Sequence, residues 1–386
     1  MTAKRKMMII LSFILMVLMG TLYSWSLFRV EVETRFDLTA VGGGVPYMVS
    51  LFFYAISMMI TGRVLNNRNT VRITVMGLIL IAIGWLGASR MQGLFSFTLF
   101  YGVFNGFGVG MVYGVPLYIL QREIPSRSGF YGGIILSGFG ASPFFGAPLV
   151  SFLRSLGGLE TTFLVFAFIV ALMIAPAALL FRTDKFKSES QPISVLPDRT
   201  FFIVLYVLFL IATLVGLMMI GLSYRMGTIN YGFQPAAVTA LMSLFALCNG
   251  AARPLFGLLM DKKGLFFAAT LSLSSIALAA FIALVNRGES LSLYGLSFSI
   301  FWLNLGAWLA MMPQAIRHYF GTESYARTFG MLFTAYGFGA IGGTILSGYI
   351  LEIFPTTANI YALTVLVVLI AFVFLAVAKK LSRRIF

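Results

Sequence analysis

Long apolar segments follow one another along the whole chain, and they constrain its fold more than any other feature. A helix needs about 20 mostly apolar residues to cross the core of a bilayer, and twelve segments of the chain are close to this length. We therefore predict an all-α integral membrane protein with twelve transmembrane helices. The predicted spans are Met7–Phe28, Val41–Thr61, Val71–Ala88, Leu94–Leu117, Gly129–Phe152, Thr161–Phe181, Phe201–Ser223, Pro235–Met260, Leu265–Leu284, Leu291–Met312, Phe329–Ile350 and Thr357–Ala378.

The composition indicates that lipid rather than water surrounds most of the chain. Only 10% of the residues are charged and 60% are hydrophobic, whereas a water-soluble domain carries about 25% charged residues. The single cysteine, Cys248, and the single histidine, His318, provide neither a disulfide nor a metal cluster. Because the sequence also contains no recognisable pair of nucleophile and base, we expect a lipid-embedded protein without enzymatic activity, catalytic residues, metal or cofactor.

The chain divides into two similar halves around a polar connection. The longest stretch between predicted spans, Arg182–Thr200, contains lysines, serines and two prolines. Gly62 and its surroundings recur at Gly257, an offset of 195 residues (257 − 62), which is close to half of the 386-residue chain. A repeat of this kind predicts two six-helix halves. The predicted division is an N-terminal half at 1–181, a cytoplasmic linker at 182–200 and a C-terminal half at 201–386.

Lysine and arginine are distributed unevenly between the two sides of the predicted spans. With the N-terminus in the cytoplasm, the cytoplasmic segments hold 20 of these residues and the outer loops hold six, which together with Arg253 makes 27. This asymmetry follows the positive-inside rule. The net charge of +15 therefore reflects membrane orientation and not nucleic-acid binding. We expect a multi-pass protein of the plasma membrane with both termini in the cytoplasm.

Arg253 is the charged residue that the sequence places well inside a span, because every Asp and Glu falls in a predicted loop or at a helix end. Inserting a central arginine costs at least about 2.5 kcal/mol. The guanidinium matches the two oxygens of a carboxylate, and Asn249 lies four residues earlier on the same helix face. Binding of a small organic anion is one interpretation. The alternative is structural, with both side chains bonded to helix backbone.

Aromatic residues with polar tips are further candidates for a substrate-binding cavity. Tyr113 and Tyr336 lie away from the predicted loops and beside glycines, which favours a cavity wall. Tyr23 and Trp308 complete the expected substrate-binding set. A single residue of this kind is otherwise an interface anchor or a packing residue.

Several motifs resemble known transporter families. The pattern Gly257-x-x-x-Asp261-Lys262-x-Gly264 resembles the loop signature of the major facilitator superfamily, and we expect these four residues to act as a gating loop. The segments YSWSLF from residue 23, GxGxGxxYxxP from residue 106 and NGxxRP from residue 249 resemble the oxalate/formate antiporter family and the related monocarboxylate transporters.

This resemblance implies a secondary active transporter that moves a small organic anion by alternating access, with the substrate carboxylate on Arg253 beside Asn249 and Tyr113. Oxalate exchangers of this kind carry a second cation in helix 11, where this chain has Phe-Thr-Ala-Tyr336-Gly. We therefore expect a monocarboxylate such as lactate, pyruvate or formate. No acid is visible in any predicted span, so symport with protons and anion exchange are both open. An efflux carrier for amphipathic compounds is the alternative function.

Overall fold

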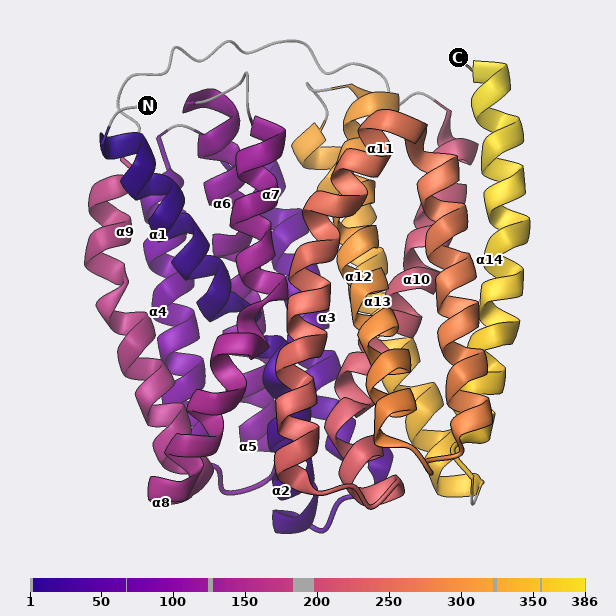
Figure 1. Ribbon diagram of the computed structural model, residues 1–386. Helices are drawn as coiled ribbons and strands as arrows, with labels where there is room; N and C mark the ends of the chain where they lie inside the picture. The colour runs from indigo at the N-terminus through magenta and orange to yellow at the C-terminus, as the bar shows by residue number, and fades with distance from the viewer. Residues whose placement is uncertain are drawn as a thin grey trace.

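The structure, a computed structural model, describes residues 3–66, 68–123, 128–182, 198–321, 325–354 and 356–385 and is helical throughout these residues apart from short connections (Figure 1). The 3-10 helix η1 and the π-helices η2 and η4 interrupt or extend the α-helices. In chain order the elements are α1 (Ala3–Met19), η1 (Gly20–Ser24), α2 (Trp25–Arg35), α3 (Ala40–Val64), α4 (Thr70–Ala88), α5 (Leu94–Phe97), η2 (Thr98–Asn105), α6 (Gly106–Glu123), α7 (Ser128–Gly140), α8 (Ser142–Leu172), α9 (Ile174–Leu180), α10 (Arg199–Arg225), η4 (Met226–Asn230), α11 (Pro235–Asn286), α12 (Leu291–Phe320), α13 (Tyr325–Ile353) and α14 (Ala358–Ile385).

Two continuous helical stretches, Tyr131–Leu180 and Pro235–Asn286, each contain two membrane crossings. Within the described residues, ten helical stretches are long and apolar enough to cross a membrane. The stretch that includes α8 bends at Gly157 and Gly158, and α11 bends at Gly264, which has φ 78° and ψ 173°. Dividing both stretches at these bends gives 10 + 2 = 12 crossings, which confirms the predicted number of transmembrane helices.

The helices form two six-helix halves that pack along one interface. Figure 1 shows the indigo-to-magenta helices of the N-terminal half beside the salmon-to-yellow helices of the C-terminal half, with both ends of the chain on the same face. We call the opposite face the remote face. Across the interface, α3 packs against α13, α7 against α11, and α2 against α10. The predicted division at 182–200 stays a prediction, since residues 183–197 lie outside the described residues.

Glycines permit the closest approach between the halves. A Cβ atom on Gly140 of α7 would lie 3.0 Å from the backbone nitrogen and Cα of Gly250 in α11, and a Cβ on Gly348 of α13 would lie 2.6 Å from the Val41 side chain of α3. Small residues at such crossings allow helices in lipid to pack through their backbones. Gly140 and Gly348 therefore allow α7 and α13 to approach the other half closely.

The first and seventh predicted spans end too early at the remote face, because the helices continue beyond Phe28 and Ser223. The first crossing continues through η1 and α2 to Arg35, and α10 reaches Arg225, so Arg29, Glu33 and Arg225 lie on helices rather than in outer loops. Arg29 is 2% exposed and Glu33 is 7% exposed. The prediction that Arg29, Glu33 and Arg225 lie in outer loops was therefore wrong, and Arg253 is not the single buried charge of the described residues. Ion pairing explains how these charges are buried.

Candidate functional site

Arg253 lies at mid-length of the first crossing of α11 and is 1% exposed. Its Nη1 donates a hydrogen bond of 2.6 Å to the carbonyl of Leu136 in α7. The guanidinium carbon lies 5.7 Å from the centre of the Phe139 ring, within the range of a cation–π contact. The side chain therefore crosses from the C-terminal half to the N-terminal half.

The Arg253 guanidinium lies beside the Tyr113 side chain, and two of its nitrogens make no hydrogen bond of normal geometry with the described residues. Both Nε and Nη2 are buried and without a hydrogen bond. These two nitrogens form one edge of the planar group, and two parallel N–H donors on such an edge match the two oxygens of a carboxylate. By contrast, Nε, Nη1 and Nη2 of Arg29 all donate, to Glu33, the Gly221 carbonyl and the Ala40 carbonyl. Arg253 is thus anchored by one nitrogen and presents a donor edge with the other two.

Asn249 lies one turn from Arg253 at the same crossing of helices. Its Nδ2 donates 2.9 Å to the Trp302 carbonyl of α12, while its Oδ1 is buried without a partner. The Oδ1 atom faces α7, since a Cβ on Gly140 would lie 2.4 Å from it. A free acceptor and a free donor edge therefore lie four residues apart on one helix face.

Six aromatic residues surround this crossing, and we call them the aromatic cage: Tyr23, Tyr54, Tyr113, Phe139, Phe333 and Tyr336. The Phe139 ring lies with its centre 5.0 Å from Tyr23, 5.9 Å from Tyr54 and 5.4 Å from Tyr113, and Tyr54 also contacts Phe333 and Tyr336. The Tyr23 and Tyr336 hydroxyls are 2.9 Å apart and join η1 of one half to α13 of the other. The cage closes the space beside Arg253 with apolar ring faces and hydroxyl tips.

Most of the predicted substrate-binding residues lie close together around Arg253. Tyr23 and Tyr113 lie within electrostatic range of Arg253, and Tyr336 is bonded to Tyr23. Trp308 is fully buried in α12, but no ring contact or hydrogen bond among the described residues joins it to the cage or to Arg253. Sequence reasoning missed Tyr54, whose position in the middle of the second predicted span, α3, was the available signal.

The four residues of the predicted gating loop lie at and before the bend of α11. Gly257 is buried, with room for the Gln314 side chain beside it, whereas Asp261, Lys262 and Gly264 are exposed. This bend lies on the face that carries the termini (Figure 1). Eight helical residues separate Arg253 from Asp261, about 12 Å, so this loop is not part of the site around Arg253.

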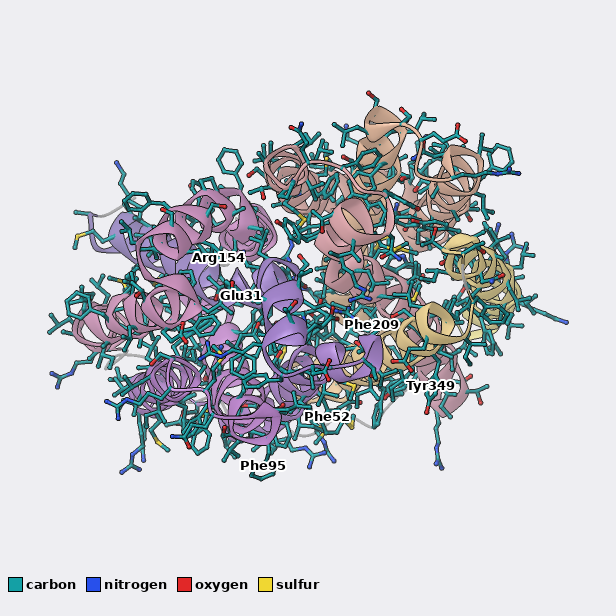
Figure 2. All side chains as sticks on the ribbon, turned by 90° about the horizontal axis from the view of Figure 1, so that it is seen from below. Glu31, Phe52, Phe95, Arg154, Phe209 and Tyr349 are labelled. Carbon is teal, nitrogen blue, oxygen red and sulfur yellow. The ribbon has the colours of Figure 1, made fainter. Side chains whose placement is uncertain are left out.

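Glu33 joins the halves on the remote face. One carboxylate oxygen accepts 2.7 Å from Nε of Arg29 on the same helix, and the other accepts from Nη1 of Arg225 at the end of α10. We call Arg29, Glu33 and Arg225 the interhalf cluster. A second pair nearby, Glu31 with Arg154 of α8, lies within the N-terminal half at 2.6 Å (Figure 2).

A cavity of about 710 Å³ lies on the remote face between α8 and α11. Its lining includes the Glu31–Arg154 pair, Ser151, Tyr224 and Thr239. Arg253 does not line it, and the interhalf cluster and the aromatic cage do not either. The donor edge of Arg253 is therefore enclosed and separate from this cavity.

Comparison with known proteins identifies similar sequences and folds. The family model of the Major Facilitator Superfamily matches residues 7–314. The chain is 24% identical over 337 residues to a protein of Oxalobacter formigenes described as an oxalate:formate antiporter, covering 84% of this chain and 79% of that protein. It is 22% identical over 333 residues to an uncharacterised transporter of the major facilitator type from Escherichia coli, covering 84% of this chain and 82% of that protein.

Solved structures show the same arrangement of helices. A bacterial homologue of the human lysosomal transporter Spinster, in an inward-facing and occupied conformation, aligns with a TM-score of 0.69 at 17% identity and covers 100% of this chain and 98% of that one. Its inward-facing, unoccupied form aligns with a TM-score of 0.66 over 98% of this chain and 96% of that one. At this identity the likeness concerns the fold alone.

Proposed function

The chain belongs to the Major Facilitator Superfamily and is a multi-pass membrane transporter, and from this premise we propose that it carries a small organic monoanion bound by Arg253. The unpartnered Nε and Nη2 edge of Arg253 carries the proposal. A buried cation with an open donor edge suits one carboxylate group. The two oxygens of the anion then satisfy the two N–H groups and neutralise the charge.

One available cation favours a monocarboxylate over a dicarboxylate. The other two buried charges of the described bundle, Arg29 and Glu33, are paired with each other, so they offer no second site for a carboxylate. The antiporter of Oxalobacter formigenes is described as exchanging oxalate and formate, which supports carboxylates as the substrate class here. The aromatic cage packs beside Arg253, and on this proposal the cargo is small, of the size of lactate, pyruvate or formate.

Asn249 favours a hydroxyl group beside the carboxylate. Its buried Oδ1 accepts no hydrogen bond, and a buried acceptor without a partner costs about 1–3 kcal/mol. A 2-hydroxy acid such as lactate would donate its hydroxyl there while its carboxylate lies on Arg253. A preference for lactate over propionate, which has the same carbon chain, measures this contribution.

Transport by alternating access follows from the position of Arg253 at the interface between the halves. The bend of α11 at Gly257, Asp261, Lys262 and Gly264 lies on the face that carries the termini, and we assign it to the conformational change. On this proposal that face is cytoplasmic and the membrane is the plasma membrane. The coupling is proton symport or anion exchange.

Thermal stability in detergent tests the proposal. A carboxylate at 100 times its dissociation constant stabilises the folded state by about 2.7 kcal/mol, so lactate, pyruvate or formate raises the melting temperature. Arg253→Ala abolishes this shift, and Arg253→Lys, which keeps the charge without the planar fork, weakens it. Arg90→Ala, an exposed arginine, is the control that keeps it.

Counterflow of radiolabelled lactate into proteoliposomes supplies the second measurement. We expect uptake in the wild type and in Arg90→Ala, and none in Arg253→Ala. A carboxylate shift that survives Arg253→Ala refutes the binding role. Resistance to amphipathic compounds on expression, unaffected by Arg253→Ala, supports the efflux alternative.

A further inference from the structure

Both halves of the bundle line the cavity on the remote face. The N-terminal half supplies Glu31 of α2 and several residues of α8, and the C-terminal half supplies Tyr224 of α10 and the start of α11. The volume of about 710 Å³ lies within the range of about 300–1,000 Å³ that is typical of ligand pockets. Because Arg253 and the aromatic cage do not line this cavity, a ligand bound here is distinct from the proposed cargo.

The cavity lies at the edge of the bundle, where the helices face lipid. On α8 and α11, exposed apolar residues lie beside the lining residues in the chain: Leu149, Phe152 and Leu244. Figure 2 shows this face, with Arg154 and Glu31 next to each other. An amphipathic ligand fits such a place, because its polar end enters the cavity while its apolar part stays in the bilayer.

Two opposite charges inside the cavity select the polar end of the ligand. Nη2 of Arg154 donates 2.6 Å to Oε2 of Glu31, and Nη1 donates 3.2 Å to the Leu27 carbonyl. Among the described residues, Nε of Arg154 and Oε1 of Glu31 have no hydrogen-bond partner. A simple anion meets repulsion from Glu31 and a simple cation meets repulsion from Arg154, whereas a zwitterion finds an opposite charge at each end.

The start of α11 adds donors for the anionic end. Gln234 precedes the helix without capping it by its side chain, and Pro235 opens it. The backbone N–H groups of Ala236 and Ala237 therefore have no partner within the helix, and Ala236 lines the cavity. The N-terminal end of a helix carries a positive partial charge and binds phosphate. Hydroxyl groups complete the lining, from Ser151, Ser155, Tyr224, Thr239 and Ser243.

We propose that this cavity binds the headgroup of a phospholipid that carries a primary amine, with the phosphate on Arg154 and the first turn of α11 and the ammonium on Glu31. An ammonium group has three N–H donors, which suit a carboxylate with a free oxygen. The acyl chains lie along the exposed side chains of Leu149, Phe152 and Leu244. Since the headgroup contacts both halves, the lipid stabilises the packing of α8 against α11, whichever anion Arg253 carries.

Thermal unfolding of delipidated protein in detergent micelles tests this inference. Dioleoyl phosphatidylethanolamine, phosphatidylcholine and phosphatidylglycerol share their acyl chains and a phosphate, but only the first has amine N–H groups for Glu31. At equal mole fractions we expect phosphatidylethanolamine to raise the melting temperature by a few degrees, because it binds the folded state. The other two raise it less. Glycerophosphoethanolamine, the same headgroup without acyl chains, gives no shift at the same concentration.

Variants of the ion pair separate the two ends of the headgroup. Arg154→Ala removes the phosphate contact, so the shift disappears with all three lipids. Glu31→Gln keeps the phosphate contact and loses the preference for the amine, so the three lipids give equal shifts, which a purely structural role of Glu31 would not produce. Glu160→Gln is the matched control, because Glu160 pairs with Arg35 on the same face and lies outside the cavity. It keeps both the shift and the preference.

Three results would overturn the inference. Equal shifts with the three lipids in the wild type refute recognition of a primary amine, and a shift that survives Arg154→Ala refutes the site. An equal shift with glycerophosphoethanolamine shows that the cavity takes a soluble zwitterion and refutes the lipid as its occupant. Should Arg154→Ala fail to fold, Arg154→Gln keeps a polar side chain without the charge, and a shift that survives in that variant refutes the site equally.

Discussion

Gly140 provides the sharpest test of the geometry around Arg253. A Cβ atom at this position would lie 2.4 Å from Oδ1 of Asn249 and 3.0 Å from the Gly250 backbone of α11. The Asn249 side chain moves first, because it is the end of a rotatable group, but its Nδ2 is bonded to the Trp302 carbonyl. The Gly250 backbone has no such freedom. Gly140→Ala therefore pushes α7 and α11 apart by tenths of an ångström.

Two terms set the size of the effect. Overpacking a close contact costs about 1–3 kcal/mol, and loss of the Asn249–Trp302 hydrogen bond adds about 0.5–1.5 kcal/mol. Together they predict a loss of stability of roughly 1.5–4.5 kcal/mol. The hydrogen bond from Arg253 to the Leu136 carbonyl lies one turn away on the same pair of helices, so separation also weakens anion binding.

Melting temperature and the lactate-induced shift are the two measurements. Gly133→Ala is the matched control, because it lies on the same helix and its added Cβ meets nothing within 4 Å. We expect Gly140→Ala to lower both quantities and Gly133→Ala to leave both close to wild type. If Gly140→Ala has the melting temperature and the lactate-induced shift of the wild type, α7 and α11 do not pack as tightly as in the structure. The placement of Asn249 Oδ1 against Gly140 is then wrong.

Three further perturbations test other parts of the structure. Gly264→Ala places a side chain at φ 78° and ψ 173°, a region that costs a non-glycine residue about 1–3 kcal/mol, and it lowers the melting temperature without removing the ligand-induced shift. Tyr23→Phe and Tyr336→Phe each cost about 0.5–1.5 kcal/mol, and the double variant costs less than their sum, because one 2.9 Å bond is lost in all three. Arg29→Ala removes one partner of a buried ion pair and lowers the free energy of unfolding by about 3–5 kcal/mol. The Arg154 side chain is 32% exposed, so loss of its ion pair in Arg154→Ala costs only about 0–1 kcal/mol. Equal losses of stability in thermal unfolding of the two variants refute this ranking.

The fold was predictable because membrane crossings are encoded locally. Each crossing is an apolar run whose length matches the bilayer, and the pattern that ends in Gly264 marked a turn that the structure places at a positive φ. Arg253 stood out for the same reason, as a charge inside such a run. Nothing beyond single segments was needed for these two predictions.

Glu33 was missed because the same criterion ends a span at the first charge. The run in the first crossing is apolar to Phe28, but the helix continues for two more turns and buries Arg29 and Glu33 against α10. The spacing of Arg29 and Glu33, four residues apart, is typical of an ion pair on one helix face. Had the helix been extended past Phe28, that spacing would have predicted the Arg29–Glu33 pair. The third member, Arg225, is 192 residues from Glu33 and was not predictable from this segment.

The direction in which a side chain points around its helix was the other unpredictable property. Trp302 and Trp308 are six residues apart, which places them about 120° apart around a helix. Trp302 contacts Tyr23 with ring centres 6.4 Å apart, so it faces the aromatic cage, and Trp308 does not share that face. Choosing between them requires the packing of α12 against its neighbours, which the sequence of one helix does not contain.

The polar contacts between the halves indicate which movement is easier. Arg253 binds the Leu136 carbonyl and Tyr23 binds Tyr336 at mid-depth, and Glu33 binds Arg225 on the remote face. Opening toward the remote face breaks all three contacts, whereas opening toward the face with the termini leaves the interhalf cluster closed. A carboxylate on Nε and Nη2 of Arg253 does not compete with Leu136 for Nη1, so the anion binds without releasing the mid-depth contact. Opening toward the remote face therefore requires release of the Glu33–Arg225 ion pair in addition to binding of the anion.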